Sequence, residues 1–220
     1  MRLILIRHGQ TPANVDGVIE TAYPGPGLTE LGERQAAAVP TALAAEPIDS
    51  ISVSRLVRTH LTAAPLAAAR GLTPVERPGI HEIEAGSTEG RTDKEAMHAY
   101  LSPLKAWADG DLGATIPGAF DGHHFYARFD ADVAAIAAEG GAVAVIVSHG
   151  AAIRAWVGGR AQNIDPHFAV EHHLDNTGIA VMEGDPAAGW SLISWQDVPI
   201  GGPALAAVAA EDPTGDPIHD

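Results

Sequence analysis

The chain has 220 residues, 46% hydrophobic and 19% charged, a composition typical of a folded globular protein rather than of a disordered one. Its 13 basic and 28 acidic side chains give a formal net charge of −15, which disfavours nucleic acid and anionic membranes as partners, because both require a basic surface. The sequence contains no cysteine, which excludes disulfides, thiolate metal sites and a cysteine nucleophile. The first apolar run is too short for a signal peptide and no segment reaches the length of a membrane span, so we expect a cytoplasmic protein.

Short apolar runs that alternate with helical patterns predict a sheet covered by helices on both faces. Strands are expected at 3–6, 51–53 and 143–147, with a hairpin at 178–182 and 191–195. Helices are expected from Thr29 to Pro40, which should kink or end the first one, from Arg55 through Leu66 with an interruption at Pro65, over 129–140 and over 151–157. This alternation favours an α/β fold, a three-layer αβα sandwich with a mostly parallel, mixed central sheet.

Two segments do not follow this rhythm. Residues 91–128 are rich in glycine, proline, histidine and aromatic residues, and we expect an insertion that forms a lid over the site. Residues 198–220 have no periodicity and are expected to form a loosely ordered C-terminal tail. The prediction is therefore a single domain over 1–197 followed by this tail.

Two of the expected strands lead directly into a histidine followed by a glycine. Arg7, His8 and Gly9 follow the first strand, and Ser148, His149 and Gly150 follow the strand at 143–147. Ligands of open α/β sheets bind beyond the carboxyl ends of the strands, where helix N-termini also point. A fixed neutral imidazole can attack phosphorus directly, provided that cations and N–H groups hold the phosphoryl oxygens. The pattern favours a phosphate pocket at this edge.

Five blocks of the sequence, in order, resemble motifs of the histidine phosphatase superfamily, the branch that includes phosphoglycerate mutases and small-molecule phosphatases. The first, Arg-His-Gly-x-Thr-x-x-Asn, is matched in full by residues 7–14. The others are matched by Pro26, Leu28, Thr29, Gly32, Gln35 and Ala36; by Ser54, Arg58, Thr62 and Ala63; by Glu82, Gly86, Glu89 and Gly90; and by Ser148 to Arg154. Five ordered blocks are hard to reach by chance.

The resemblance implies a role for each matched position. His8 would be the nucleophile, and Glu82 would protonate the leaving oxygen and then activate water. Arg7, Arg58 and His149 would hold the phosphoryl group. Neither a metal nor another cofactor is implied, because the arginines supply the positive charge. Further substrate contacts are expected from Gly9, Gln10, Thr11, Asn14, Thr21, Ala22, His123 and Gly150.

The resemblance favours a phosphatase that acts on a small phosphorylated metabolite. Two alternatives stay open: a cofactor-dependent phosphoglycerate mutase, and a non-catalytic protein that binds a phosphorylated ligand. Many phosphatase relatives have Pro-Gly-Gly-Glu-Ser where this chain has Pro117 and Gly118 followed by Ala-Phe-Asp, so substrate specificity cannot be carried over. Among the acidic neighbours, Glu84 is the replacement proton donor to test first, and Glu89 is expected to be structural. No oligomer is indicated.

Overall fold

A mixed sheet forms the centre of the computed structural model, which describes residues 1–206 and 214–215. Within this part of the chain the sheet has six strands in the order β3-β2-β4-β1-β5-β6. Strands β1 to β4 are parallel, and β5 and β6 form the antiparallel hairpin that the sequence predicts. The bounds are β1 Arg2–Arg7, β2 Ser50–Val53, β3 Val75–Glu76, β4 Val143–Ser148, β5 Ile179–Asp185 and β6 Gly189–Gln196.

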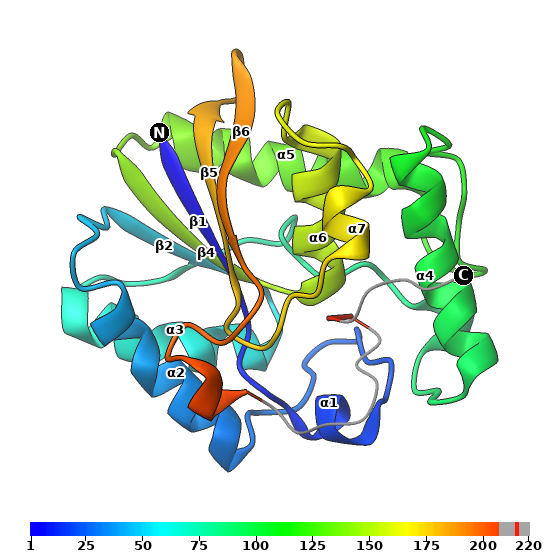
Figure 1. Cartoon of the computed structure of the whole chain (residues 1–220), viewed down its shortest axis with the longest axis horizontal. Coiled ribbons are helices and arrows are strands. Elements are labelled where there is room, and N and C mark those ends of the chain that lie inside the picture. The colour runs from blue at the N-terminus through cyan, green and yellow to red at the C-terminus, as the bar shows by residue number, and fades with distance from the viewer. Residues whose placement is uncertain (207–213, 216–220) are drawn as a thin grey trace.

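Helices cover both faces of this sheet, as Figure 1 shows, with α2 and α3 on one side and α5 and α6 on the other. The α/β fold class is therefore confirmed. The α-helices are α1 Pro12–Asp16, α2 Glu30–Ala42, α3 Val57–Arg70, α4 Lys94–Ala108, α5 Gly122–Ala138, α6 Gly150–Arg160 and α7 Phe168–Glu171, and the 3₁₀ helices are η1 Gly86–Thr88 and η2 Pro203–Leu205.

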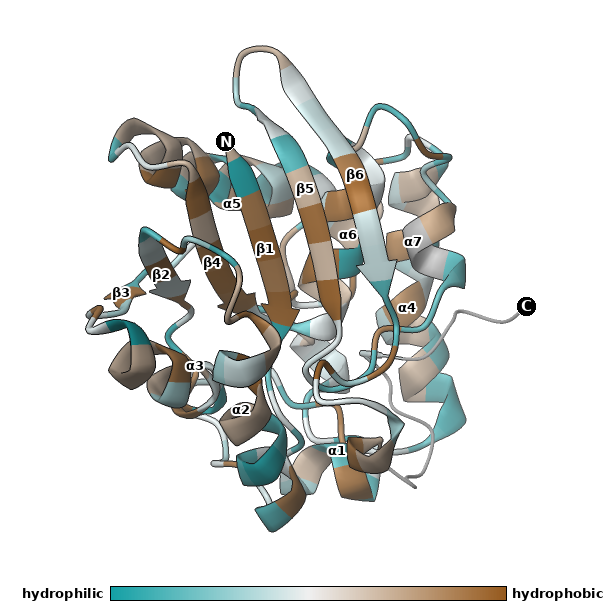
Figure 2. Cartoon of the chain, turned by 60° about the vertical axis from the view of Figure 1, so that its left-hand side comes forward, coloured by the Kyte–Doolittle hydropathy of each residue, from teal (hydrophilic) through white to brown (hydrophobic). Residues whose placement is uncertain are grey.

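Alternate residues of the central strands build two hydrophobic cores. Leu3 and Leu5 of β1 pack in the core that includes residues of α4, α5 and α6. Ile4 and Ile6 pack in the core that includes residues of α2 and α3. Figure 2 shows the apolar character of the central strands. Because both faces of β1 are covered, its sequence is a continuous apolar run instead of an alternating one.

The predicted helices form, and α2 and α3 both continue past the prolines that were expected to kink, end or interrupt them. Thr29 caps α2, and its hydroxyl oxygen accepts a hydrogen bond from the backbone N–H of Gly32 at 3.0 Å. Pro40 lies inside α2 and Pro65 lies inside α3, which continues to Arg70. Buried side chains on α3, such as Leu66, hold that helix against the sheet and offset the lost backbone hydrogen bond.

The segment 91–128 contains a helix that its composition does not suggest. Asp93 caps α4, and Tyr100 and Trp107 on this helix are 0% and 4% exposed, so they belong to the core. Phe120, in contrast, is 56% exposed. That the segment acts as a lid stays a prediction.

The C-terminal stretch is described only in part. Residues 207–213 and 216–220, on which most of the predicted tail falls, lie outside the described residues. Thr214 is 8% exposed, and the carbonyl of Gly215 accepts a hydrogen bond from the backbone N–H of Leu174 at 3.0 Å. In the described part of the chain, no helix combines the length and the apolarity needed to cross a membrane.

Candidate active site

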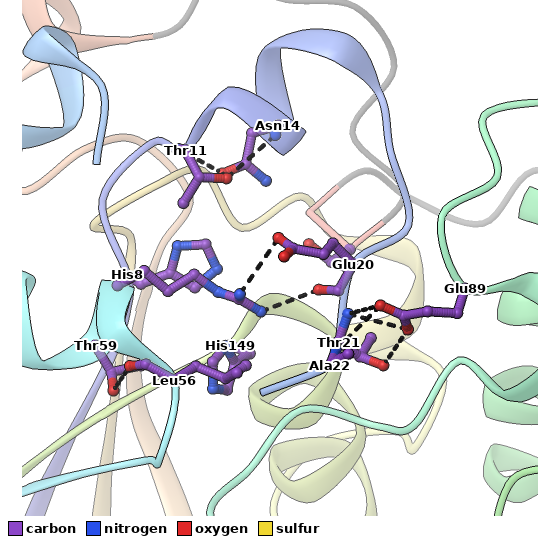
Figure 3. Close-up of polar contacts among 12 residues, drawn as sticks. His8, Thr11, Asn14, Glu20, Thr21, Ala22, Leu56, Thr59, Glu89 and His149 are labelled. Carbon is purple, nitrogen blue, oxygen red and sulfur yellow. Dashed lines mark hydrogen bonds and ion pairs between the residues drawn. The ribbon is translucent and has the colours of Figure 1, made fainter. Parts of the chain in front are cut away.

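Two buried histidines lie side by side beyond the carboxyl ends of neighbouring strands. Strands β1 and β4 pair in parallel with Arg7 opposite Ser148, so His8 and His149 each stand one residue past this last pair. The centroids of the two imidazole rings are 5.3 Å apart. Both side chains appear in the close-up of Figure 3. The strand-end pattern in the sequence therefore brings the two rings to one place.

The imidazole of His8 is held in one tautomer. Its Nδ1 lies 2.8 Å from the carbonyl oxygen of Gly9, and because a carbonyl only accepts, Nδ1 must carry the proton. This leaves the lone pair on Nε2. Burial lowers the pKa of His8 well below its ordinary value, and the charges of Arg58 and Arg7 lower it further. A neutral ring with a free Nε2 lone pair is a competent nucleophile.

The backbone at Gly9 permits this arrangement. Its N–H donates to the hydroxyl of Thr62 at 2.9 Å, which ties the end of β1 to helix α3. A Cβ at Gly9 would lie only 2.7 Å from the carbonyl oxygen of Gly32. The close approach of α2 to the strand end therefore requires glycine at this position.

Arginines from two elements lie near His8. Arg58, on α3, is 3% exposed, and its Nη2 donates to the carbonyl of Glu20 at 3.1 Å. Arg7, at the end of β1, is 0% exposed; its Nη1 donates to the carbonyl of Leu174 at 2.8 Å, and its Nη2 to the hydroxyl of Thr214 at 2.9 Å. Both guanidinium groups lower the pKa of His8, so each places positive charge near its ring.

Glu82 is a buried carboxyl at the N-terminus of α6. Its Oε1 accepts hydrogen bonds from the backbone N–H groups of Ile83 at 2.9 Å and Ala152 at 2.8 Å, and its Oε2 accepts one from Ala151 at 3.3 Å. Burial nevertheless raises the pKa of Glu82, against the opposing effects of these bonds and of Arg58 and Arg7. A carboxyl that holds its proton more firmly than usual suits general acid catalysis.

His149 is held by a hydroxyl on the neighbouring strand end. Its Nε2 lies 2.7 Å from Oγ of Ser54, just after β2, and its Nδ1 is buried with no hydrogen-bond partner among the described residues. Burial lowers the pKa of His149 well below its ordinary value, and Arg58 contributes in the same direction. Nδ1 is thus a buried polar atom available to a ligand.

His81 is a site residue that the sequence analysis did not single out. Its ring centroid lies 5.9 Å from that of His149, edge to face. Burial lowers the pKa of His81 to about 4, with Arg128 contributing next. The one feature of the sequence that could have indicated a site position for His81 is that it directly precedes Glu82. A histidine in a loop is otherwise not distinctive.

The expected substrate contacts divide into two groups. Thr11 and Asn14 line a small cavity of about 10 Å³ together with His8, Arg58 and Glu20. Asn14 Oδ1 accepts a hydrogen bond from the backbone N–H of Thr11 at 2.9 Å, so the loop after β1 is closed on itself. Gly150 is the first residue of α6, beside His149.

The other residues expected to contact substrate do not line the small cavity. The side-chain oxygen of Gln10 accepts from the Thr29 hydroxyl at 2.8 Å. Thr21 and Ala22 donate from their backbone N–H groups to the Glu89 carboxylate at 2.9 and 3.1 Å, which gives Glu89 its structural role. His123 is exposed on α5 and does not line either of the cavities described here.

A second, larger cavity of about 480 Å³ includes His81 in its wall. We call it the outer cavity. Arg128 in this wall is already engaged: its Nη1 donates to the carbonyl of Gly79 at 2.6 Å, its Nη2 donates to the carbonyl of Glu82 at 2.7 Å, and Glu84 lies 3.7 Å from it. The lining residues are Tyr23, Arg55, Pro78, Gly79, His81, Glu84, His124, Arg128, Ala131 and Asp132.

Two further charged residues, Glu84 and Arg154, contact Arg128 and Thr214 respectively. Glu84, the replacement proton donor, has 32% of its side chain exposed and pairs with Arg128. Arg154 is 0% exposed, and its Nη1 donates to the carbonyl of Thr214 at 3.3 Å. Neither residue lines the small cavity beside His8.

Several of the known proteins that this chain is similar to are phosphatases. A mycobacterial glucosyl-3-phosphoglycerate phosphatase has a solved structure that superposes with a TM-score of 0.74 at 26% identity, covering 89% of this chain and 98% of that one. The PE-PGRS family protein PE_PGRS11 of Mycobacterium tuberculosis is 39% identical over 91% of this chain and 37% of its own length. Adenosylcobalamin/alpha-ribazole phosphatase of Salmonella typhimurium is 33% identical over 58% of this chain and 62% of its own length. The chain thus spans less than two thirds of these two relatives.

The family model for the histidine phosphatase superfamily (branch 1) matches residues 3–198, which is most of the chain. This range includes Arg7, His8, Arg58, Glu82 and His149. The chain therefore belongs to the histidine phosphatase superfamily, as the five sequence blocks predicted.

Proposed function

We propose that this domain hydrolyses small phosphomonoesters without a metal, through a phosphohistidine intermediate on His8. The observation that carries the proposal is the state of His8 itself. Its ring is neutral and fixed through Nδ1, it lies 5.3 Å from His149, and the buried Arg58 and Arg7 place positive charge near it. Most of the work in phosphoryl transfer is positioning and charge stabilisation, and this cluster supplies both.

In the first step, Nε2 of His8 attacks phosphorus and the bond from phosphorus to the ester oxygen breaks. Glu82 transfers its proton to the departing oxygen, so the organic product leaves as an alcohol. Arg58, Arg7 and the free Nδ1 of His149 are the groups proposed to hold the phosphoryl oxygens. Burial raises the pKa of Glu82, so this carboxyl keeps its proton to a higher pH than an exposed glutamate does.

In the second step, water attacks the phosphohistidine and the bond from phosphorus to nitrogen breaks. The Glu82 carboxylate accepts a proton from the water, inorganic phosphate forms, and His8 returns to its neutral state. The hydrogen bond from Nδ1 to Gly9 is kept in both steps, because only Nε2 changes its bonding. The cycle therefore regenerates the starting protonation states.

The outer cavity is the proposed position of the organic part of the substrate. His81 connects it to the catalytic cluster, since the ring faces His149 and also lines the cavity. Its volume of about 480 Å³ suits a metabolite-sized group. The names of similar proteins point the same way: glucosyl-3-phosphoglycerate phosphatase, alpha-ribazole phosphatase and phosphoserine phosphatase.

Hydrolysis of p-nitrophenyl phosphate tests the proposal. We expect turnover that EDTA does not abolish and that vanadate inhibits, together with an acid-labile phosphoprotein that accumulates on rapid mixing. The phosphoryl label should map to His8 by mass spectrometry under alkaline conditions. Turnover with no label on His8 would contradict the mechanism.

Two further measurements separate the alternatives. A phosphoglycerate mutase would convert 3-phosphoglycerate to 2-phosphoglycerate, whereas a phosphatase would release inorganic phosphate from its substrate. A non-catalytic binding protein would bind vanadate in calorimetry but hydrolyse no member of a phosphorylated-metabolite library. The same library identifies the preferred leaving group.

A further inference from the structure

An acidic side chain lies against the arginine that is proposed to hold phosphate. Oε2 of Glu20 is 3.7 Å from Nη1 of Arg58, and both residues line the small cavity with His8. The dashed lines at Glu20 in Figure 3 mark this ion pair and the hydrogen bond to its backbone carbonyl. A carboxylate therefore stands beside the guanidinium to which the phosphoryl oxygens would bind.

The contact between these two charges is loose. Charge-assisted hydrogen bonds are usually about 2.7–2.9 Å long, so 3.7 Å is an ion pair without a hydrogen bond. Oε2 of Glu20 is buried and has no hydrogen-bond partner among the described residues, and the same is true of Nη1 and Nε of Arg58. Two buried donors on one guanidinium are thus unused, and an oxyanion could take both.

The backbone around Glu20 is fixed, so the side chain is the part that can move. Arg58 holds the carbonyl of Glu20, and Glu89 accepts the next two backbone N–H groups, from Thr21 and Ala22. The Glu20 side chain is 24% exposed, compared with 4% for Arg58. A rotation of the Glu20 side chain toward solvent would clear the arginine without disturbing the loop.

Burial also makes this an unfavourable place for a carboxylate. Burial raises the pKa of Glu20, and the nearby Glu89 raises it further, while Arg58 lowers it. The charge on Glu20 is therefore only partly compensated. A phosphoryl dianion, with more charge and more acceptor oxygens, would form stronger contacts with Arg58 than Glu20 does.

We propose that Glu20 competes with the phosphoryl group for Arg58 and thereby limits inhibition by the product phosphate. This inference rests on the proposed function, because it assigns Arg58 to the phosphoryl group. Free phosphate must displace Glu20 using the small cavity alone. An ester substrate gains further contacts in the outer cavity through its organic group. Glu20 thus weakens binding of the product phosphate, and the ester offsets the same cost through its contacts in the outer cavity.

The test compares the binding of inorganic phosphate to Glu20→Gln, Glu20→Ala and the unmodified chain, by titration calorimetry. Both variants remove the competing charge beside Arg58, and we expect phosphate to bind at least about fivefold more tightly to each. The inhibition constant of phosphate against p-nitrophenyl phosphate hydrolysis should fall by the same factor. Glu95→Gln is the matched control, because it makes the same charge change on a side chain that is 90% exposed. Its affinity for phosphate should be unchanged.

Thermal melts establish that both Glu20 variants are folded. Phosphate affinity that is unchanged or weaker in both variants would overturn the competition. An equal gain in Glu95→Gln would also overturn it, since the effect would then come from net charge. Calorimetry measures phosphate binding without turnover, so it tests Glu20 separately from catalysis. If the Glu20 variants bind phosphate more tightly but the domain hydrolyses no substrate, the proposed function is refuted and the role of Glu20 is not.

Discussion

The small cavity beside His8 and the outer cavity are built in different ways. The small cavity lies at the end of β1, beside α1 and the first turn of α3, and His8 and Arg58 in its wall are at most 3% exposed. The outer cavity is lined by Tyr23, which is 71% exposed, by the loop after β3 and by one face of α5. Backbone pairing fixes the first region, whereas surface side chains shape the second.

This difference separates chemistry from specificity. The position of His8 depends on the central sheet, and a change there disturbs the core. The exposed residues of the outer cavity, such as Tyr23 and His124, can change one at a time at little cost in stability, since substitutions at exposed positions usually have small effects. Substitutions in the two regions should therefore differ in size and in the kinetic constant that they change.

The largest effect is expected from His8→Ala. This change removes the nucleophile, and we expect kcat for p-nitrophenyl phosphate to fall by about 10³-fold or more. Stopped assays with a sensitive phosphate readout would measure the residual activity. His98→Ala, at an exposed position on α4, is the matched control and should retain full activity. Comparable rates in the two variants would mean that His8 is not the nucleophile.

Glu82→Gln is expected to have the next largest effect. General acid catalysis contributes about 10²–10⁴-fold, and the loss should be greater for an alkyl phosphate, whose oxygen leaves poorly, than for p-nitrophenyl phosphate. A steeper dependence of kcat on the leaving group is the measurement that identifies the role. An equal loss for both substrates would indicate that Glu82 acts only by holding the N-terminus of α6.

The pH dependence of kcat/KM should show these two groups in the free enzyme. His8 must be neutral, and because its pKa lies well below 6.5, the rate should not fall as pH decreases through 6.5. Glu82 must be protonated, and because its pKa is raised above 4.5, the rate should fall on the alkaline side of that raised value. Glu82→Gln should lose this alkaline decrease. A decrease in rate below pH 6.5 would show that His8 titrates like an exposed imidazole.

The smallest effect is expected from His124→Ala, in the wall of the outer cavity. We expect KM for the preferred metabolite to rise by about three- to tenfold with little change in kcat, because the contact is made equally in the ground and transition states. His123→Ala, one position earlier and outside the lining, should change KM less. A large loss of kcat in His124→Ala would indicate that this residue of α5 takes part in the catalytic step.

The residues at strand ends were predictable because their signal is local. An apolar run that stops at a histidine specifies both the strand and the place of its last side chain, so the positions of His8 and His149 follow from the sequence alone. The helices at Thr29 and after His149 follow from caps and periodicity in the same way. The five ordered blocks then supplied the roles.

Contacts that depend on distant segments were not predictable. Thr214 meets Arg7 across 207 positions of sequence, and no periodicity encodes that contact. Helix α4 was missed because proline, glycine and histidine around it outweighed the buried spacing of Tyr100, Leu104 and Trp107. The short β3, with two exposed residues, has no pattern to detect. His124, and not His123, lines the outer cavity because of the rotation of α5, which the sequence does not fix.

The direct pairing of β1 with β4 has a consequence for how this domain can vary. A one-residue insertion or deletion within either strand would turn the following side chain to the opposite face of the sheet. The two imidazoles would then lie on opposite faces of the sheet. Most of the apolar side chains of the strand could still pack in one of the two cores, because both faces of the sheet are covered. We therefore expect natural length variation in this chain to collect in the loops around the outer cavity, and single-residue length changes in β1 or β4 to abolish activity more readily than folding.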